Sequence, residues 1–200
     1  MKKILITAFD PFGGQQKNAS LEVLKHLEIF SKTYQIHTLI LPTIFQAVED
    51  IISAKIDILS PDIIILLGEA GLTKEIRIER VAINIDDARI KDNLGNQPID
   101  LPIKDKGENA YFSTLPIKKI KAALDSKNIP SIISNSAGTF VCNHAMYLVL
   151  HYLQEKKPSN IVAGFIHFPY VESQIKDETT PHLPLKQSVK ALETIIEACL

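Results

Sequence analysis

Short runs of β-branched and other apolar residues alternate with longer amphipathic stretches along almost the whole chain. The short runs predict β-strands, which we expect at residues 3–8, 35–41, 62–68, 131–134 and 160–166. Such alternation is typical of βαβ units around a mainly parallel sheet that is covered on both faces. The pattern therefore predicts an α/β fold, a single α/β/α sandwich with a mainly parallel, twisted sheet.

Helices are predicted between the strands, where apolar residues recur with the period of an α-helix. Three apolar stripes follow this period: Ala47, Ile51, Ala54 and Ile58; Ala145, Leu148, Val149, Tyr152 and Leu153; and Leu185, Val189, Leu192, Ile196 and Cys199. A free cysteine behaves as a small apolar side chain. The position of Cys199 on the third stripe therefore predicts a place in or near the core.

Two stretches depart from this rhythm. Residues 76–85 alternate between apolar and polar positions, which predicts one longer strand with mixed faces that passes a site. Residues 86–115 are polar and rich in turn-forming residues, without a helical or strand period. A connection of this length inside a domain is often a binding loop or a lid, and it can also contain a hairpin that periodicity does not reveal.

Composition and charge narrow the class of protein. The 200 residues are 46% hydrophobic and 22% charged with a net charge of −1, which is typical of one folded domain over residues 1–200. A near-neutral chain does not attract nucleic acid or acidic membrane surfaces. We find no apolar run near the roughly 20 residues of a membrane span, nor one that suits a signal peptide. We therefore expect no nucleic-acid or membrane partner. The chain has only two cysteines, so we also expect a cytoplasmic protein whose thiols stay reduced.

Cys142 is the candidate nucleophile. It opens a predicted helix after the strand at 131–134, and a helix N-terminus stabilises a thiolate. His167 directly follows the strand at 160–166. Because the carboxyl ends of parallel strands meet at the edge where ligands bind, we expect Cys142 and His167 to lie together at that edge.

Glu79 is the candidate to orient the imidazole, since a carboxylate does this in Ser and Cys triads. It lies in the largely apolar stretch 76–84, where a carboxylate is costly to bury without a partner. The spacing supports at least as well an ion pair between Glu79 and Arg77, Arg80 or Arg89. The other five of the six histidines are better explained by surface exposure, packing or local hydrogen bonds.

Two other kinds of site have weaker support. Cys142 and His144 are two residues apart, but the chain has no CxxC or HExxH motif, and Cys-x-His alone is a weak metal signal. The loop at 9–14 lacks the glycine patterns that bind phosphates, and its two phenylalanines suit an apolar ligand. The residues therefore give little support for a metal site, and they favour an apolar ligand over a phosphate in this loop.

Five separated sequence motifs occur along the chain in a characteristic order. They are ITAFDPFGG at 6–14 with NAS at 18–20, ERVAIN at 79–84, DNLG at 92–95, SNSAGTFVCNH at 134–144 and GFIHFP at 164–169. Through these motifs the chain resembles, almost end to end, the pyroglutamyl peptidases of type I, also called pyrrolidone carboxyl peptidases. Members of that family are cysteine peptidases that remove an N-terminal pyroglutamyl residue from peptides.

The resemblance implies roles for the candidate residues. Cys142 would be the nucleophile, His167 the general base and then acid, and Glu79 the group that orients His167. Asn18 would hydrogen-bond the lactam, and Arg89 would lie close to the reacting carbonyl. The walls of the pocket for the lactam ring would be Phe9, Phe12, Phe140 and Val141. The implied fold is one sandwich domain, similar to those of phosphorylases and hydrolases, assembled as a homotetramer or dimer without a cofactor.

A few positions depart from the family pattern. Glu69 replaces the usual Gln, Leu72-Thr73 replaces Gly-Arg, and Lys91 replaces Pro. An ionised Glu69 can accept a hydrogen bond from the lactam N–H but cannot donate one to the lactam carbonyl. Alternatives are therefore an aminopeptidase with altered N-terminal specificity, a catalytically silent paralogue, or a nucleoside phosphorylase-type enzyme whose Phe-rich loop holds a base.

Overall fold

The computed structural model describes residues 1–28, 31–156 and 160–200. Its strands are β1 (Lys2–Phe9), β2 (Tyr34–Leu41), β3 (Ile63–Glu69), β4 (Ile76–Glu79), β5 (Val81–Ile83), β6 (Ala110–Phe112), β7 (Ser131–Ser134) and β8 (Val162–Phe168). Its helices are α1 (Ala19–Lys25), α2 (Phe45–Leu59), α3 (Ile117–Ser126), α4 (Val141–Lys156) and α5 (Leu185–Cys199), with a short 3-10 helix η1 (Glu172–Gln174). The five strands predicted from short apolar runs are all present, each within two residues of its expected bounds.

The main sheet is mixed but mostly parallel. Within the described residues, six strands form it in the order β2-β1-β3-β8-β4-β7. β1, β2, β3 and β8 run parallel to one another, whereas β4 is antiparallel to β8 and parallel to β7. The predicted mainly parallel sheet is therefore confirmed, although the two short strands at one edge run in the opposite direction.

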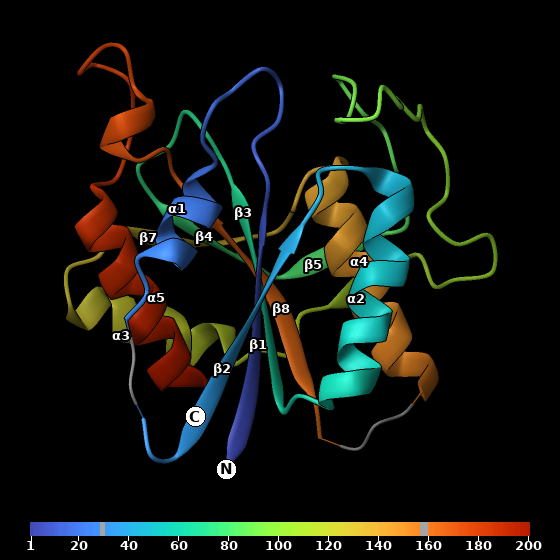
Figure 1. Cartoon of the computed structure of the whole chain (residues 1–200), viewed down its shortest axis with the longest axis horizontal. Helices are drawn as coiled ribbons and strands as arrows, with labels where there is room; N and C mark the ends of the chain where they lie inside the picture. The colour runs from blue at the N-terminus through green and yellow to red at the C-terminus, as the bar shows by residue number, and fades with distance from the viewer. Residues whose placement is uncertain (29–30, 157–159) are drawn as a thin grey trace.

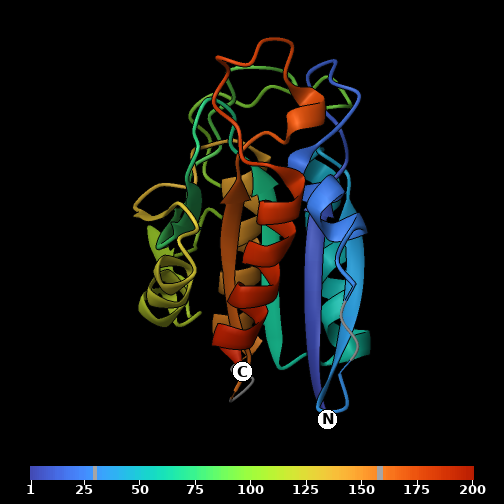
Figure 2. The ribbon, with the colours of Figure 1, turned by 90° about the vertical axis from the view of Figure 1, so that its left-hand side faces the viewer.

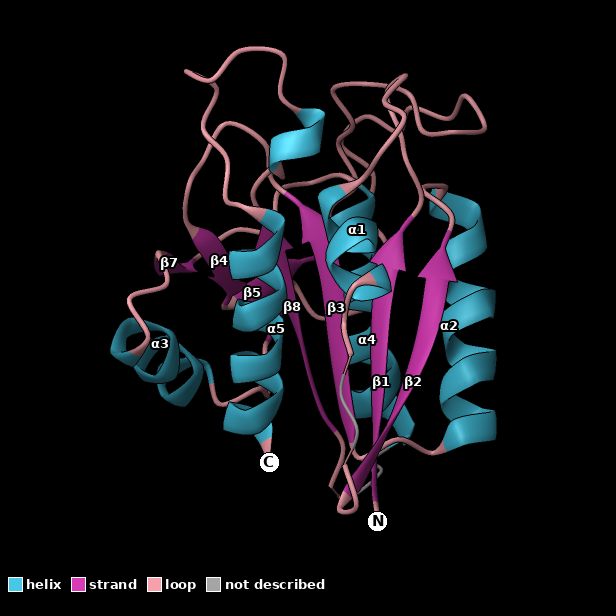
Figure 3. Cartoon of the chain, turned by 60° about the vertical axis from the view of Figure 1, so that its left-hand side comes forward, coloured by secondary structure: helices cyan, strands magenta, loops and turns pink. Residues whose placement is uncertain are grey.

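Helices cover both faces of this sheet (Figures 1 and 3). α1, α3 and α5 contribute to the core on one face, and α2 and α4 to the core on the other. In β3, Ile63 and Ile65 belong to the first core, while Ile64 and Leu66 belong to the second. Alternate residues of a strand point to opposite faces, so an apolar run buries both faces of the strand. The predicted α/β/α sandwich is confirmed.

Long connections gather at one end of the sheet, away from the two chain termini (Figure 2). Residues 10–18, 70–75 and 169–184 follow the carboxyl ends of β1, β3 and β8. Since these strands are parallel, their following loops meet at the same edge. This edge is where a ligand is expected to bind in an open α/β sheet.

The single long strand expected at 76–85 is wrong, because the chain changes sheets at Arg80. β4 ends at Glu79 in the main sheet, and β5 pairs with β6 in a separate two-stranded sheet. The backbone of Arg80 donates its N–H to Ser134 O and accepts from Ser113 N–H. The backbone of Arg80 thus bonds both to the end of β7 and to the residue after β6. An alternating sequence pattern does not reveal that a strand leaves one sheet and enters another.

The apolar stripe expected on α2 is also wrong. Ile51 and Ile58 are 36% and 84% exposed, whereas Val48 and Ile52 are almost fully buried. The core face of α2 consists of Phe45, Val48, Ile52, Ile56 and Leu59. Both sets of residues repeat with a helical period. Packing against the sheet and α4, rather than periodicity, selects the face that is buried.

The stripes on α4 and α5 pack as expected. Ala145, Leu148 and Val149 are buried on α4, and Leu192 and Ile196 are buried on α5. Cys199, at the end of α5, is partly buried and packs against the core next to that helix. Burial raises the pKa of the Cys199 thiol to about 12. The prediction that Cys199 lies in or near the core is confirmed.

The irregular stretch 86–115 has few regular elements. It contains β6 and an isolated bridge between Asp86 and Leu101. The other residues of the stretch form turns and extended loop, part of which extends beyond α2 and α4 (Figure 1). Near its end, the Thr114 N–H donates to Ala163 O at the start of β8.

Candidate active site

A buried carboxylate and an imidazole form the centre of the site. His167 on β8 and Glu79 on β4 are 6% and 0% exposed. The antiparallel pairing sets Arg77 opposite His167 and Glu79 opposite Phe165, so Glu79 and His167 are diagonal neighbours on one face of the sheet. Their side chains are bonded, with 2.8 Å between His167 Nδ1 and Glu79 Oε1. Glu79 thus has a histidine partner, and no ion pair to an arginine is formed within the described residues.

Cys142 is the second residue of α4. It reaches the site by a different route from the one that the sequence suggests. β7 runs antiparallel to β8, so its carboxyl end points away from His167, and the expectation that both residues follow strands ending at one edge is wrong for Cys142. Residues 135–140 instead bring the chain back, so that α4 begins beside His167.

Gly68 on β3 makes room for this start of α4. A Cβ atom at Gly68 would lie 3.0 Å from Cys142 Sγ and 2.7 Å from the ring of Phe165. The ring of Phe165 packs in turn beside the His167 imidazole, with 4.7 Å between the ring centroids. The absence of a side chain at position 68 therefore lets the nucleophile and the imidazole approach the sheet closely.

Cys142 and Glu79 together raise the pKa of His167. Burial alone would lower the pKa of His167. The charge of Cys142 and the hydrogen bonds with Cys142 and Glu79 outweigh this effect and raise the pKa to about 9. Near neutral pH the imidazole is therefore protonated beside the Cys142 side chain. A thiolate is the nucleophilic form of cysteine, and an imidazolium is a proton donor.

A cavity of about 280 Å³ opens beside Cys142 and His167. Four of the seven residues expected to bind substrate line it: Phe12, Glu69, Arg89 and Phe140. The rings of Phe12 and Phe140 are 5.9 Å apart at a tilt of 41° and give the cavity an apolar side. Sequence reasoning missed its other lining residues, which are Asp87, Ile90, Ala137, Gly138 and Thr139. Their closeness in sequence to Arg89 and Phe140 is a signal that could have found them.

The other three expected pocket residues are buried near the cavity. Phe9 is 2% exposed and stacks on Phe165. Asn18 caps α1 by accepting from the Ser20 N–H, and its amide donates to Asp10 O. Val141 is the fully buried first residue of α4. Their contact with a substrate stays a prediction.

Glu69 enters the cavity from the end of β3. Its Oε2 atom accepts hydrogen bonds from the Ala19 N–H and from Gln174 Nε2, both at 2.6 Å. Gln174 is held in turn by Val171, whose N–H donates to Gln174 Oε1. Burial raises the pKa of Glu69, against the lowering effects of these hydrogen bonds and of the charge on His167. Sequence reasoning did not find Gln174, which is 105 residues away.

The described part of the chain shows neither a metal-binding cluster nor a membrane-spanning helix. Residues 1–28, 31–156 and 160–200 hold no group of three or more His, Cys, Asp or Glu side chains placed to bind a metal ion. Over the same ranges, no helix is long and apolar enough to cross a membrane.

Comparisons with known proteins agree with the motifs. The family model for pyroglutamyl peptidases matches residues 2–200. Pyrrolidone-carboxylate peptidase 1 of Caldanaerobacter subterraneus subsp. tengcongensis is 50% identical over 196 residues, which cover 98% of this chain and 96% of that one. A pyrrolidone-carboxylate peptidase of Brachyspira hyodysenteriae is 50% identical over 199 residues, covering 99% and 98% of the two chains.

Solved structures show the same agreement in three dimensions. Pyroglutamyl peptidase I of Bacillus amyloliquefaciens matches with a TM-score of 0.93 at 38% identity, covering 100% of this chain and 97% of that one. Pyrrolidone carboxyl peptidase from Thermococcus litoralis matches with a TM-score of 0.94 at 35% identity, covering 100% and 93%. The resemblance drawn from the five motifs is confirmed, and the chain belongs to the pyroglutamyl peptidase family.

Proposed function

We propose that this protein is a cysteine peptidase that removes an N-terminal pyroglutamyl residue from peptides through Cys142, His167 and Glu79. One arrangement carries the proposal. A cysteine at a helix N-terminus faces a buried imidazole that a carboxylate orients, at the side of a partly apolar cavity. These are the parts that covalent acyl transfer by a thiol requires.

The reaction proceeds in two steps. The Cys142 thiolate attacks the pyroglutamyl carbonyl carbon, forming the S–C bond, and the scissile C–N bond breaks while the His167 imidazolium gives its proton to the departing amine. A water then attacks the thioester with neutral His167 as its base. The thiolate leaves, and free pyroglutamate and a protonated His167 remain. Glu79 keeps Nδ1 of His167 as the protonated nitrogen, so that Nε2 performs both transfers.

The cavity suits the substrate group. Pyroglutamate is a small neutral lactam with no ammonium group, so an apolar site with few polar groups suffices to recognise it. Phe12 and Phe140 offer the apolar surface, and Arg89 is a cationic group beside Cys142 in the same cavity. We assign the developing oxyanion to the Cys142 backbone N–H at the start of α4 and to the Arg89 guanidinium.

Glu69 supports a second candidate, an aminopeptidase that accepts an ordinary N-terminus. Its carboxylate uses Oε2 for the Ala19 and Gln174 hydrogen bonds and borders the cavity. The remaining oxygen can accept from the lactam N–H or from a substrate ammonium group. The lactam remains the preferred ligand, because Phe12 and Phe140 give the cavity an apolar side that suits a neutral group.

Pyroglutamyl and alanyl naphthylamides separate the two candidates. We expect the wild type to cleave the pyroglutamyl substrate much faster and the Glu69→Gln variant to widen that preference, because the amide removes the charge that attracts an ammonium group. Faster alanyl cleavage by the wild type would overturn the pyroglutamyl assignment in favour of the aminopeptidase.

The nucleophile is tested by release of free pyroglutamate from a pyroglutamyl peptide. Cys142→Ala should reduce the rate to background, whereas Cys199→Ala, which removes the thiol on α5, should retain activity. Equal rates for the wild type and Cys142→Ala would contradict the triad. Release of pyroglutamate by the wild type would also exclude a catalytically silent paralogue, since such a protein releases none. A homo-oligomeric assembly and a cytoplasmic location stay predictions.

A further inference from the structure

The first turn of α4 is hydrogen-bonded to residues 83–86, which lead directly to the cavity residues Asp87 and Arg89. Asn143, directly after Cys142, is fully buried and uses its whole amide. Asn143 Oδ1 accepts from the Ile83 N–H at 3.0 Å, while Nδ2 donates to Ile83 O at 2.9 Å and to Ile85 O at 3.0 Å. The nucleophile's neighbour thus fixes the backbone of residues 83–85.

His144 continues this attachment by one residue. His144 Nδ1 lies 2.8 Å from Asp86 Oδ2, and both side chains are largely buried, at 12% and 9% exposure. The Phe45 ring packs against the imidazole in a T-shaped arrangement with 5.4 Å between the ring centroids, which limits the positions that the imidazole can take. A buried carboxylate needs such a partner, so the contact ties Asp86 firmly to α4.

Thr139 adds a third tie on the other side of Cys142. The Asp87 N–H donates to Thr139 O at 2.9 Å, and Thr139 Oγ1 donates to Asp87 O at 2.7 Å. The other backbone partners of this segment outside itself are Ala110, which pairs with Ile83, Asn109, which bonds Asn84, Leu101, which bonds Asp86, and Pro98, which bonds Ala88. All four partners belong to the same irregular stretch 86–115. The ties from residues 139–144 are therefore what connects residues 83–87 directly to the nucleophile's helix.

Arg89 depends on this attachment. Within the described residues its guanidinium has no hydrogen bond or ion pair that would hold it, and the side chain is exposed at the cavity. The backbone two residues after Asp87 therefore determines where the charge lies. A displacement of about 1 Å in a group that acts on a reacting atom can cost on the order of 100-fold in rate.

We infer that His144, together with Asn143, is a positioning residue that places Arg89 beside Cys142 by fixing residues 83–87. The inference rests on the proposed function, in which Arg89 stabilises the oxyanion. Loss of the His144 contact misplaces the guanidinium while leaving the thiolate, the imidazolium and the two phenylalanines in place. The loss therefore lowers kcat and changes KM little.

Four variants test this inference with a pyroglutamyl naphthylamide. His144→Phe keeps an aromatic ring against Phe45 but has no nitrogen for Asp86, and we expect kcat to fall about 10- to 100-fold with KM within about twofold. His144→Asn offers an amide N–H close to the position of Nδ1 and should restore most of kcat. Thr139→Val removes a single tie and should give a smaller loss of the same kind. The matched control, His151→Phe on the same helix, should leave kcat unchanged.

A double-mutant cycle shows whether the effect passes through Arg89. In an Arg89→Ala background, His144→Phe should cost little further activity, since the misplaced group is already absent. Alkylation of Cys142 by neutral iodoacetamide should proceed at the wild-type rate in His144→Phe. Additive losses in the cycle, or slower alkylation, overturn the inference. Absence of pyroglutamate release by the wild type would instead contradict the proposed function.

Discussion

Two histidines in this molecule have nearly the same immediate partner, yet only His167 also contacts Cys142. His144 and His167 each contact a carboxylate oxygen at 2.8 Å. Cys142 makes the difference, because its charge and hydrogen bond act on His167 and raise the pKa of that imidazole. At the scale of the residue, the chemistry of a side chain is thus set by which neighbour faces its second nitrogen.

Replacement of Cys142 by Ser should lower the pKa of His167 below its value of about 9. Serine carries no charge near neutral pH, so the burial of the imidazole is then opposed by the neighbouring carboxylates Glu79 and Glu69 without the charge of Cys142. An NMR titration of the His167 ring protons measures the change. Cys199→Ser is the matched control and should leave the titration where it is in the wild type. An unchanged titration in Cys142→Ser would mean that the thiolate does not hold the proton on His167.

At the scale of the element, α2 shows how an apolar helix chooses its buried face. Its sequence contains two sets of apolar residues with a helical period, and either set could cover the sheet. In the structure, Ile52 packs in the core with residues of α4, while Ile58 is 84% exposed. The same residue type in the same helix should therefore contribute very differently to stability.

The contrast between the two isoleucines is measurable by urea unfolding. Ile52→Ala should lower the free energy of unfolding by about 2–5 kcal/mol, because it removes a buried side chain and leaves a cavity. Ile58→Ala, with the same chemical change at an exposed position, should stay within about 0.5 kcal/mol of the wild type. Equal losses at both positions would contradict this assignment of the buried face of α2.

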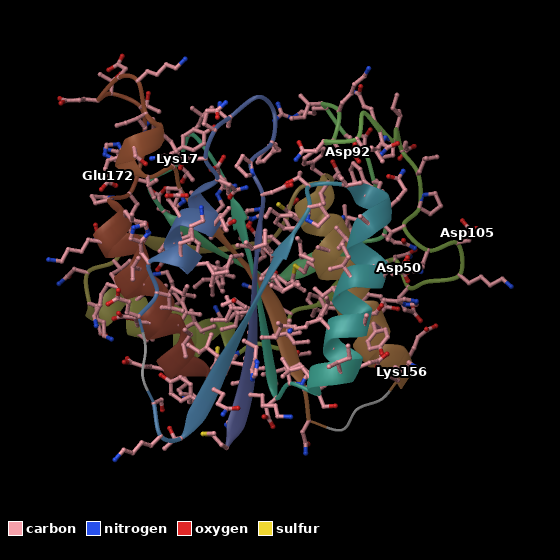
Figure 4. All side chains as sticks on the ribbon, viewed as in Figure 1. Lys17, Asp50, Asp92, Asp105, Lys156 and Glu172 are labelled. Carbon is pink, nitrogen blue, oxygen red and sulfur yellow. The ribbon has the colours of Figure 1, made fainter. Side chains whose placement is uncertain are left out.

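At the scale of the whole molecule, loops far apart in the sequence are joined around the cavity. Asn93 donates to Asp10 Oδ1 and to Pro11 O, and Asp10 Oδ1 also accepts from the Thr43 N–H. Asp92, labelled in Figure 4, accepts from the backbone of Phe45 at the start of α2 and from Asn96. These bonds connect the loop after β1, the start of α2 and the stretch 86–115.

Asp92 should make stability depend on acid pH. Burial alone would raise the pKa of Asp92. Hydrogen bonds from Asn96, Phe45 and Leu94 together outweigh this effect, so the net shift of the pKa is downward. A carboxyl group with a pKa below its unfolded value stabilises the fold above about pH 4, and that contribution is lost as pH falls through the folded-state pKa.

The Asp92→Asn variant tests this dependence. It should lower the free energy of unfolding at pH 7 by about 1–3 kcal/mol, and the difference from the wild type should shrink as the pH falls below about 4. The control is Asp50→Asn, at an exposed position on α2 (Figure 4), which should change stability little. Urea unfolding at a series of pH values measures both, and a difference that grows toward acid pH would contradict the assignment.

The sequence by itself determined the class of fold and the identity of the three central candidates. Apolar runs of strand length identify strands that are buried on both faces, because burial and backbone hydrogen bonding act on consecutive residues. Cys142 at a helix start and His167 at a strand end can be found in the same local way, and the motifs around them establish the family.

Tertiary structure alone decided the rest. All of these features depend on contacts between residues that are distant in the sequence. They are the reversed direction of β4 and β7, the buried face of α2, and the contacts of Gln174 with Glu69 and of His144 with Asp86. Such pairs have no periodic signature, since they depend on which segments the whole fold brings together. Cys142 illustrates both levels: the sequence places it at a helix start, and only the return of residues 135–140 brings it to His167.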